Sequence, residues 1–146
     1  MDVELDETDW KIISILRESH VPNNAVAKEL GLSEGAIRQR LKKLKESGVM
    51  VVRGMINPDI LANQQVAMIA VNVAESALIE KKAAEIAELD HVQSVNITTG
   101  RYDLMVEILV DSNKGLVHFL TEQLSRVQGV SSTESFLFLK GYRKYV

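Results

Sequence analysis

Apolar positions near the start of the chain recur with the period of an α-helix. Within residues 5–20, Ile12 and Leu16 lie one helical turn apart. Asp6 or Thr8 is expected to cap this first helix, because a side-chain oxygen there accepts a hydrogen bond from a backbone N–H of the first turn. Acidic residues at its start also suit the positive end of the helix dipole. The pattern therefore predicts a capped, amphipathic first helix.

A second, short helix is indicated by Val26 and Leu30, which also lie one turn apart. Asn23 or Asn24 is expected to cap its N-terminus. Gly31 is expected to end it in the left-handed conformation that glycine tolerates. A tight turn then leads into a further helical segment.

The third helix begins at Ser33 and has the clearest pattern. Ile37, Leu41 and Leu44 fall at i, i+4 and i+7 and form one apolar stripe, so the polar and basic residues face away from the core. Two helices joined by a tight turn, the second basic on its outer side, are typical of a helix-turn-helix. A β-branched run at 49–53 predicts an adjoining strand and wing.

Beyond a polar, turn-rich connection, the pattern predicts strands and helices in the order βαββαβ. The predicted strands span residues 64–74, 91–100, 101–110 and 131–142, and the predicted helices span 75–89 and 113–127. The fold class is therefore α+β, with an N-terminal winged helix-turn-helix domain and a C-terminal ferredoxin-like βαββαβ sandwich domain. The expected boundaries are 1–53 for the first domain, 54–64 for the connection and 65–146 for the second domain.

The strands of the second domain are apolar on both faces. A ferredoxin-like fold places both helices on one face of the sheet, and the other face is polar when it meets water. Here Val66 and Met68 alternate with Ala67 and Ile69, and the last strand carries Phe136 on one parity with leucine on the other. Monomers seldom expose large contiguous apolar patches. The pattern therefore predicts a homodimer formed through the second face.

Charge is sorted along the chain. The protein has 17 Lys plus Arg against 20 Asp plus Glu, which gives a net charge of −3. Residues 28–53 nevertheless carry seven basic and three acidic side chains, whereas both flanking regions are acidic. Five cations on one helix simply solvate it in many proteins. The turn, the short helix before it and the expected wing favour instead a surface for a polyanion.

The remaining composition excludes several kinds of site. There are no cysteines, so thiolate zinc sites, disulfide scaffolds and cysteine nucleophiles are excluded. The three histidines lie far apart without ligand-like spacing. We therefore expect no catalytic residues, no metal and no cofactor. An acidic N-terminus and the lack of an apolar run of about 18 residues predict a cytoplasmic location and no membrane partner.

The basic helix predicts binding to double-stranded DNA at a roughly palindromic site, since a two-fold dimer presents two recognition helices. Arg38 and Gln39 suit contacts with base edges, and the lysines and Arg53 suit contacts with phosphates. Arg40 lies at the margin of the apolar stripe, where it is either a surface cation or a structural residue paired inside the domain. The full predicted DNA-binding set is Ser33, Glu34, Gly35, Arg38, Gln39, Lys42, Lys43, Lys45 and Arg53.

Four motifs in this order resemble the Lrp/AsnC family of bacterial and archaeal transcriptional regulators. They are "LDETDWKIISIL" at 5–16, "LGLSEGAIRQRLKKLKESGVM" at 30–50, "NP" at 57–58 and the Gly-x-x-Asp loop "GRYD" at 100–103. The resemblance covers nearly the whole chain. It implies a DNA-binding N-terminal domain and an effector-sensing C-terminal domain that dimerises through its sheet.

The resemblance also implies an amino-acid effector, bound between dimers near the Gly-x-x-Asp loop, and assembly of some members to octamers. Asp103 offers an acceptor for the ligand's ammonium, and backbone N–H groups near Gly100 offer donors for its carboxylate. Alternatively, Gly100 serves only a turn with positive φ and Asp103 only caps that turn. The implied effector-binding set is Thr99, Gly100, Arg101, Tyr102, Asp103, Thr133 and Ser135.

Two other functions compete with a sequence-specific, effector-modulated regulator. An architectural protein would bind DNA through charge and assembly alone, without an effector, but the net charge of −3 disfavours general coating of DNA. Some relatives of the family are enzymes that decarboxylate tetrapyrroles. Such chemistry needs clustered acid–base groups, whereas His91 and His118 have no evident partners. We therefore expect no enzymatic activity.

Overall fold

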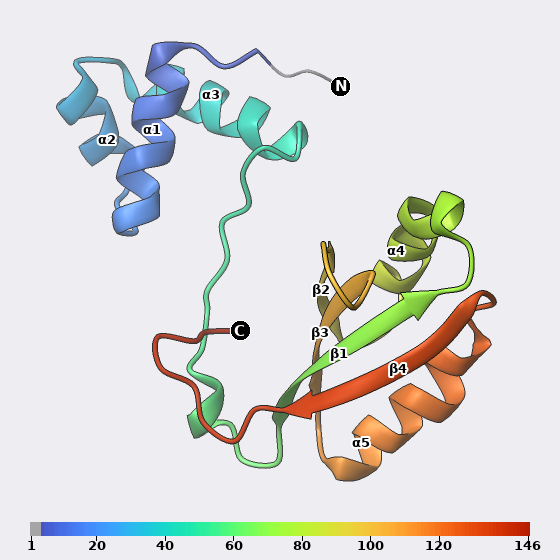
Figure 1. The fold of residues 1–146 in the computed structure, drawn as a ribbon. Helices are drawn as coiled ribbons and strands as arrows, with labels where there is room; N and C mark the ends of the chain where they lie inside the picture. Colours follow the sequence, from blue (N-terminus) through green and yellow to red (C-terminus); the bar gives the residue numbers. More distant parts are fainter. Residues whose placement is uncertain (1–3) are drawn as a thin grey trace. The chain divides into compact units, whose positions relative to one another are not determined.

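The computed structural model describes residues 4–146, which divide into two compact units. The first unit ends at Gly54 and the second spans Met55–Val146. The first unit contains α-helices, and the second contains a sheet with helices (Figure 1). Within the described residues, no helix is long and apolar enough to cross a membrane.

The first unit is a bundle of α1 (Glu7–Glu18), α2 (Asn23–Leu30) and α3 (Glu34–Glu46). Its buried core takes side chains from all three helices, namely Ile12, Val26, Ala27, Ile37, Leu41 and Leu44. The apolar stripe expected on the third helix therefore packs inward, as the helical period requires. The helix-turn-helix prediction is confirmed.

The N-terminal caps follow the sequence at α1 and α3 but not at α2, whose C-terminal end at Gly31 is left-handed as expected. Asp6 caps α1, and its carboxylate accepts a hydrogen bond from the backbone N–H of Asp9 at 2.8 Å. Ser33 caps α3. The N-cap of α2 is Pro22, so the prediction of Asn23 or Asn24 is wrong. The proline side chain has no oxygen that could accept from the N–H groups of the first turn, so no side-chain cap forms.

The strand expected at 49–53 does not form. In the part of the chain that the structure describes, these residues form no strand, and Val51 and Val52 are exposed. A β-branched sequence favours the extended conformation, but a strand also needs a neighbour to complete its hydrogen-bonded ladder. Asn57 and Pro58 behave as their sequence suggests, since Asn57 caps a 3₁₀ turn at Pro58–Ile60.

The second unit has the βαββαβ order expected from the sequence. Its strands are β1 (Gln65–Val73), β2 (Val92–Ile97), β3 (Leu104–Val110) and β4 (Val130–Leu137), and its α-helices are α4 (Ile79–Ala87) and α5 (Asn113–His118). The strands form one antiparallel sheet in the order β2-β3-β1-β4. Both helices lie on the same face of this sheet (Figure 1). The α+β prediction is confirmed.

The second helix of this unit is not α-helical along its whole length. Beyond α5 the chain forms a π-helical turn at Phe119–Gln123 and a 3₁₀ turn at Leu124–Arg126. In a π turn the hydrogen bonds join residues five apart, so residues five apart come to nearly the same side. Phe119 and Leu124 are separated by five positions, and both are fully buried in the core. The wider turn thus lets both side chains fill the same core.

The two faces of the sheet differ in how they are covered. The helix-covered face is the core, formed by buried side chains that include Ile69 of β1 and Val106 of β3. The opposite face, here called the open face, carries Met68 opposite Phe136 in the register of β1 and β4. Phe136 is 42% exposed. This second apolar face is the feature from which a dimer was predicted.

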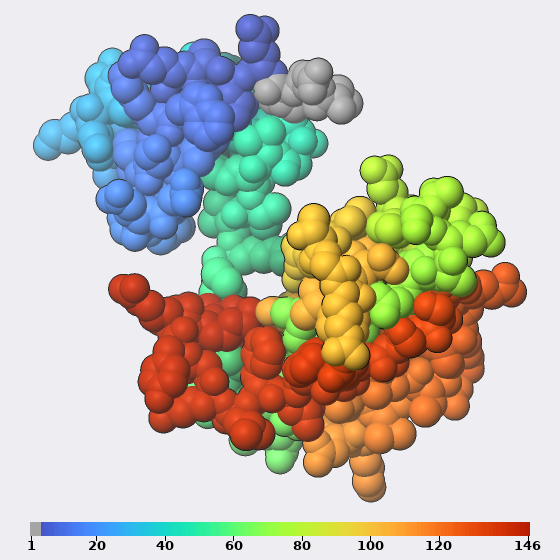
Figure 2. Space-filling model, viewed as in Figure 1, coloured from blue at the N-terminus to red at the C-terminus, as the bar shows by residue number. Residues whose placement is uncertain are grey.

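An ion pair also lies on the open face. Lys144 of the C-terminal tail places its Nζ atom 2.6 Å from the Glu107 carboxylate on β3. Backbone hydrogen bonds of 2.9 and 3.0 Å join Ile56 and Val146 in both directions. Figure 2 shows the tail, in red, packed beside the connection that precedes β1. The tail is therefore held in place at Lys144 and at Val146.

Candidate nucleic-acid interface and ligand sites

The outer side of α3 presents a continuous polar surface. Ile37, Leu41 and Leu44 hold the other side in the core, with exposures of 0%, 7% and 1%. The surface, here called the recognition face, consists of Glu34, Gly35, Arg38, Gln39, Lys42, Lys43 and Lys45, all exposed. Of the remaining predicted DNA contacts, Ser33 lies at the N-cap of α3, and Arg53 is exposed in the extended segment that follows. The structure thus brings most of the predicted set onto one helix face.

Arg40 turns away from the recognition face and anchors α3 to α1. Its Nη1 atom lies 2.6 Å from Oδ2 of Asp6 and 2.8 Å from Oδ1 of Asp9. Asp9 is only 3% exposed, so its charge needs a partner inside the domain. Of the two roles left open for Arg40, the structure gives the structural one.

The same network shifts two pKa values. The backbone N–H of Asp9 and the Arg40 guanidinium both donate to Asp6, and they hold the pKa of that carboxyl below its usual value. The two carboxylates in turn raise the pKa of Arg40, with Asp9 the larger cause. Because the pKa of Asp6 is depressed on folding, its contribution to stability is present above about pH 4 and is lost as the pH falls further.

We expect Arg40→Met to lower the free energy of unfolding by roughly 2 kcal/mol at pH 7, because Asp9 is left buried without its charged donor. The deficit should shrink below about pH 4, since a protonated Asp6 no longer pairs with Arg40. Part of the acid sensitivity should remain in the variant, because the N-cap bond to Asp6 is kept. Thermal melts from pH 3 to pH 7 measure both effects.

Lys11→Met is the matched control, because Lys11 pairs with Glu7 at 2.6 Å on the exposed side of the same bundle. An exposed pair of this kind contributes little to stability. Equal melting temperatures for the two variants would contradict the anchoring role of Arg40.

The Gly-x-x-Asp loop joins β2 to β3 and is tied to β1 by Asp103. The Oδ2 atom of Asp103 accepts a hydrogen bond of 2.8 Å from the backbone N–H of Val73. Its own backbone N–H donates to the carbonyl of Val71 at 3.0 Å. Gly100 has φ +109°, a conformation that glycine adopts readily. Both residues therefore have structural roles, and Asp103 keeps one carboxylate oxygen for another partner.

Tyr102 connects the loop to β4 by contacting Glu134, a residue that sequence reasoning missed. Its hydroxyl forms a hydrogen bond with the carboxylate of Glu134, and the guanidinium of Arg101 lies 5.5 Å from its ring centroid. Thr133 and Ser135 flank Glu134, so their side chains point to the other face of the strand. Only the tertiary pairing of loop and strand identifies Glu134.

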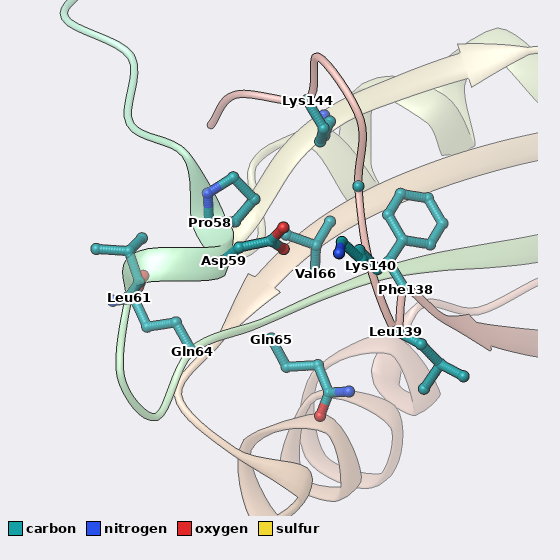
Figure 3. Close-up of a pocket in the computed structure, with 11 residues that line it drawn as sticks. Pro58, Asp59, Leu61, Gln64, Gln65, Val66, Phe138, Leu139, Lys140 and Lys144 are labelled. Atoms are coloured by element: carbon teal, nitrogen blue, oxygen red, sulfur yellow. The ribbon is translucent and has the colours of Figure 1, made fainter.

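A cavity of about 570 Å³ lies elsewhere in the second unit, between the connection that precedes β1 and the tail that follows β4. Asp59 and Lys140 lie on opposite walls, and Val66 and Phe138 add apolar surface (Figure 3). A volume of this size suits a small molecule. None of these residues belongs to the predicted effector set, because the cavity depends on how the tail folds back.

Titratable side chains do not cluster as metal ligands do. Across residues 4–146, no group of three or more His, Cys, Asp or Glu side chains is placed to hold a metal ion.

Comparisons with known proteins agree with the division into two units. A winged helix-turn-helix DNA-binding family model matches residues 5–49, and an Lrp/AsnC ligand-binding domain model matches residues 66–145. The HTH-type transcriptional regulator FL11 of Pyrococcus abyssi is 33% identical over 146 residues, which cover 99% of this chain and 95% of that protein. The regulator LysM of Saccharolobus solfataricus is 32% identical over 140 residues, 95% of this chain and 96% of the relative.

Solved structures share the fold. Escherichia coli AsnC is similar with a TM-score of 0.68 and 23% identity, over 95% of both chains. A Neisseria meningitidis transcriptional regulator, NMB0573, solved as a complex with L-Met, is similar with a TM-score of 0.71 and 24% identity, over 97% of this chain and 94% of that one.

Proposed function

The chain belongs to the Lrp/AsnC family of DNA-binding transcriptional regulators, and from that premise we propose that it acts as a homodimer on a roughly palindromic operator, with its DNA affinity tuned by an amino acid. The observation that carries the DNA-binding part is the recognition face, which is exposed, basic and held in orientation by Arg40. A helix entering the major groove needs these properties.

Within the recognition face, Arg38 and Gln39 read base edges. The lysines and Arg53 meet phosphates, which fix the register of the protein on the duplex. Dimerisation uses the open face of the sheet, where Met68 and Phe136 form part of an apolar surface. Two recognition helices per dimer then fit two half-sites.

The effector is an amino acid bound at the loop of residues 99–103. Asp103 has a carboxylate oxygen beyond the one that bonds Val73, and it is positioned to accept from an ammonium group. The complex of the Neisseria regulator with L-Met supports an amino acid as the chemical class. Further assembly of dimers toward octamers belongs to the same proposal, because the effector then lies between dimers.

We expect Lys42→Gln to weaken DNA binding and to flatten its dependence on salt. If each subunit's Lys42 meets one phosphate, the slope of log K against log salt should become less negative by roughly 1.8 per dimer. Fluorescence anisotropy on a fragment of the protein's own promoter, from about 50 to 300 mM salt, measures the slope. Lys81→Gln on α4 is the control, because it removes the same charge from an exposed site in the other unit.

The wild-type protein should also prefer some promoter fragment over random DNA of the same length. Equal affinity for both, with equal slopes for the two lysine variants, would overturn sequence-specific binding and support an architectural role.

A further inference from the structure

Glu34, the first residue of the recognition helix α3, carries a carboxylate that pairs with the guanidinium of Arg38. The Oε1 atom of Glu34 lies 2.6 Å from Nη2 of Arg38, four residues later, and their side chains are 49% and 70% exposed. A second acid, Glu46, lies at the far end of α3 with its carboxylate 3.8 Å from Lys42. The two acids have the same charge, and each lies four residues along the chain from its cation, but only Glu34 lies at the helix N-terminus.

A carboxylate at this position is not explained by the fold. Ser33 already caps the helix, with its Oγ atom accepting from the backbone N–H of Ala36 at 3.1 Å. An exposed ion pair adds little to stability. An acid in the first turn does suit the helix dipole, but that effect requires no partner at Arg38. In a helix-turn-helix the N-terminal residues of the recognition helix contact base edges, so Glu34 faces a polyanion there.

Gly35, the next residue, is also unexplained by the fold. It has a helical conformation, where glycine is unfavourable relative to alanine. A Cβ added at Gly35 would meet only Ser33 Oγ, at 4.0 Å. Packing inside the domain therefore does not exclude a side chain. The clearance beside Glu34 suits close approach of a surface from outside the chain.

The hydrogen-bonding groups of Glu34 and Arg38 are complementary to the major-groove edge of one base pair. In the major groove a G·C pair presents the acceptors N7 and O6 of guanine next to the donor N4–H₂ of cytosine. The O6 and N4 atoms are themselves hydrogen-bonded, so they lie roughly 2.9 Å apart. In the protein, a guanidinium donor and a carboxylate acceptor lie 2.6 Å apart. Donor faces acceptor and acceptor faces donor at matching separation.

We propose that Glu34 and Arg38 act as one unit that reads a single G·C base pair in each half-site, with Arg38 on guanine and Glu34 on the N4 amino group of cytosine. This inference rests on the proposed DNA-binding function and names what the recognition helix selects. At an A·T pair in either orientation, the donor and acceptor positions on the edge change. Glu34 would then meet an acceptor, or Arg38 a donor, and the carboxylate would repel the DNA without a compensating bond.

The test is selection from a random DNA library by the full-length wild-type protein, followed by affinities for every base pair at each selected position. Wild type should prefer G·C over A·T at one position per half-site by roughly tenfold or more. Glu34→Gln keeps the size of the side chain but replaces an obligate acceptor by an amide that both donates and accepts. It should reduce that preference to less than about threefold. Affinity for random DNA should rise, because one negative charge per subunit is lost.

Glu46→Gln is the matched control, because it removes the same charge from the same helix and should leave the preference at every position unchanged. Arg38→Lys keeps the charge but loses the planar fork. It should relax the same position as Glu34→Gln. Thermal melts of the three variants verify that each is folded.

An unchanged preference profile in Glu34→Gln would overturn the proposal while leaving sequence-specific binding intact. So would equal relaxation in the Glu46→Gln control, or relaxation at two different positions in the Glu34 and Arg38 variants. A wild-type protein that selects no sequence at all would instead overturn the proposed function.

Discussion

Phe136→Glu is expected to convert the protein to monomers and to lower its affinity for operator DNA by roughly two orders of magnitude. Phe136 lies on the open face of the sheet opposite Met68 and is 42% exposed in the single chain. If a second copy covers this face, the substitution buries a carboxylate in an apolar interface without a partner, which is strongly unfavourable. A monomer engages one half-site only, so the gain from linking two recognition helices is lost.

Sedimentation and DNA-binding measurements on the same samples connect the two losses. Val117→Glu is the control, because Val117 is an exposed apolar residue on α5, the helix that packs on the other face of the sheet. A Phe136→Glu variant that stays dimeric would show that the open face is not the dimer interface. A monomeric variant with full operator affinity would show that dimerisation is not required for binding.

Features fixed by local periodicity were predictable from the sequence. The stripe of Ile37, Leu41 and Leu44 needs only the helical period, and the order βαββαβ needs only the change of period from segment to segment. The left-handed Gly31 and the cap at Ser33 are also local, since each depends on the conformation of one or two residues.

Features that depend on distant partners were not predictable. Arg40 was left between two roles because its partners lie more than thirty residues away in the chain. The strand expected at 49–53 failed for a related reason, since β-propensity does not supply a neighbouring strand. At the loop, the sequence points to Asp103. The partner of Tyr102 is Glu134, which lies between the two residues expected on β4, and only the pairing of the strands reveals it.

The recognition face and the Gly-x-x-Asp loop differ in whether the side chains proposed for binding are also needed by the fold. On α3 the fold needs the inner stripe and Arg40, so the residues of the recognition face are free to serve DNA. At the loop, Asp103 already holds the backbone of Val73, and our proposal gives the same side chain a second role in binding the effector. A substitution that removes both duties at once cannot distinguish them.

Asp103→Asn separates these duties and is expected to abolish the response to the effector while preserving the fold. The asparagine carbonyl still accepts the hydrogen bond from Val73, but the residue no longer carries the charge that pairs with an ammonium group. Thermal melts of the wild type against the common amino acids should reveal a ligand that stabilises the protein by about 2.7 kcal/mol at a hundredfold excess over Kd. Without ligand, the melting temperature of the Asp103→Asn variant should be close to that of the wild type. With ligand, the variant should show no increase in melting temperature.

Asp59→Asn is the matched control, because Asp59 is the acid on the wall of the cavity between the connection and the C-terminal tail. Its ligand-induced shift should equal that of the wild type. If Asp59→Asn loses the shift and Asp103→Asn keeps it, the amino acid binds in the cavity and the loop has only its structural role. If the shift survives in both variants, neither carboxylate holds the ammonium group. Asp103→Ala should in addition melt lower than Asp103→Asn without ligand, because only the alanine variant leaves the Val73 N–H without its acceptor.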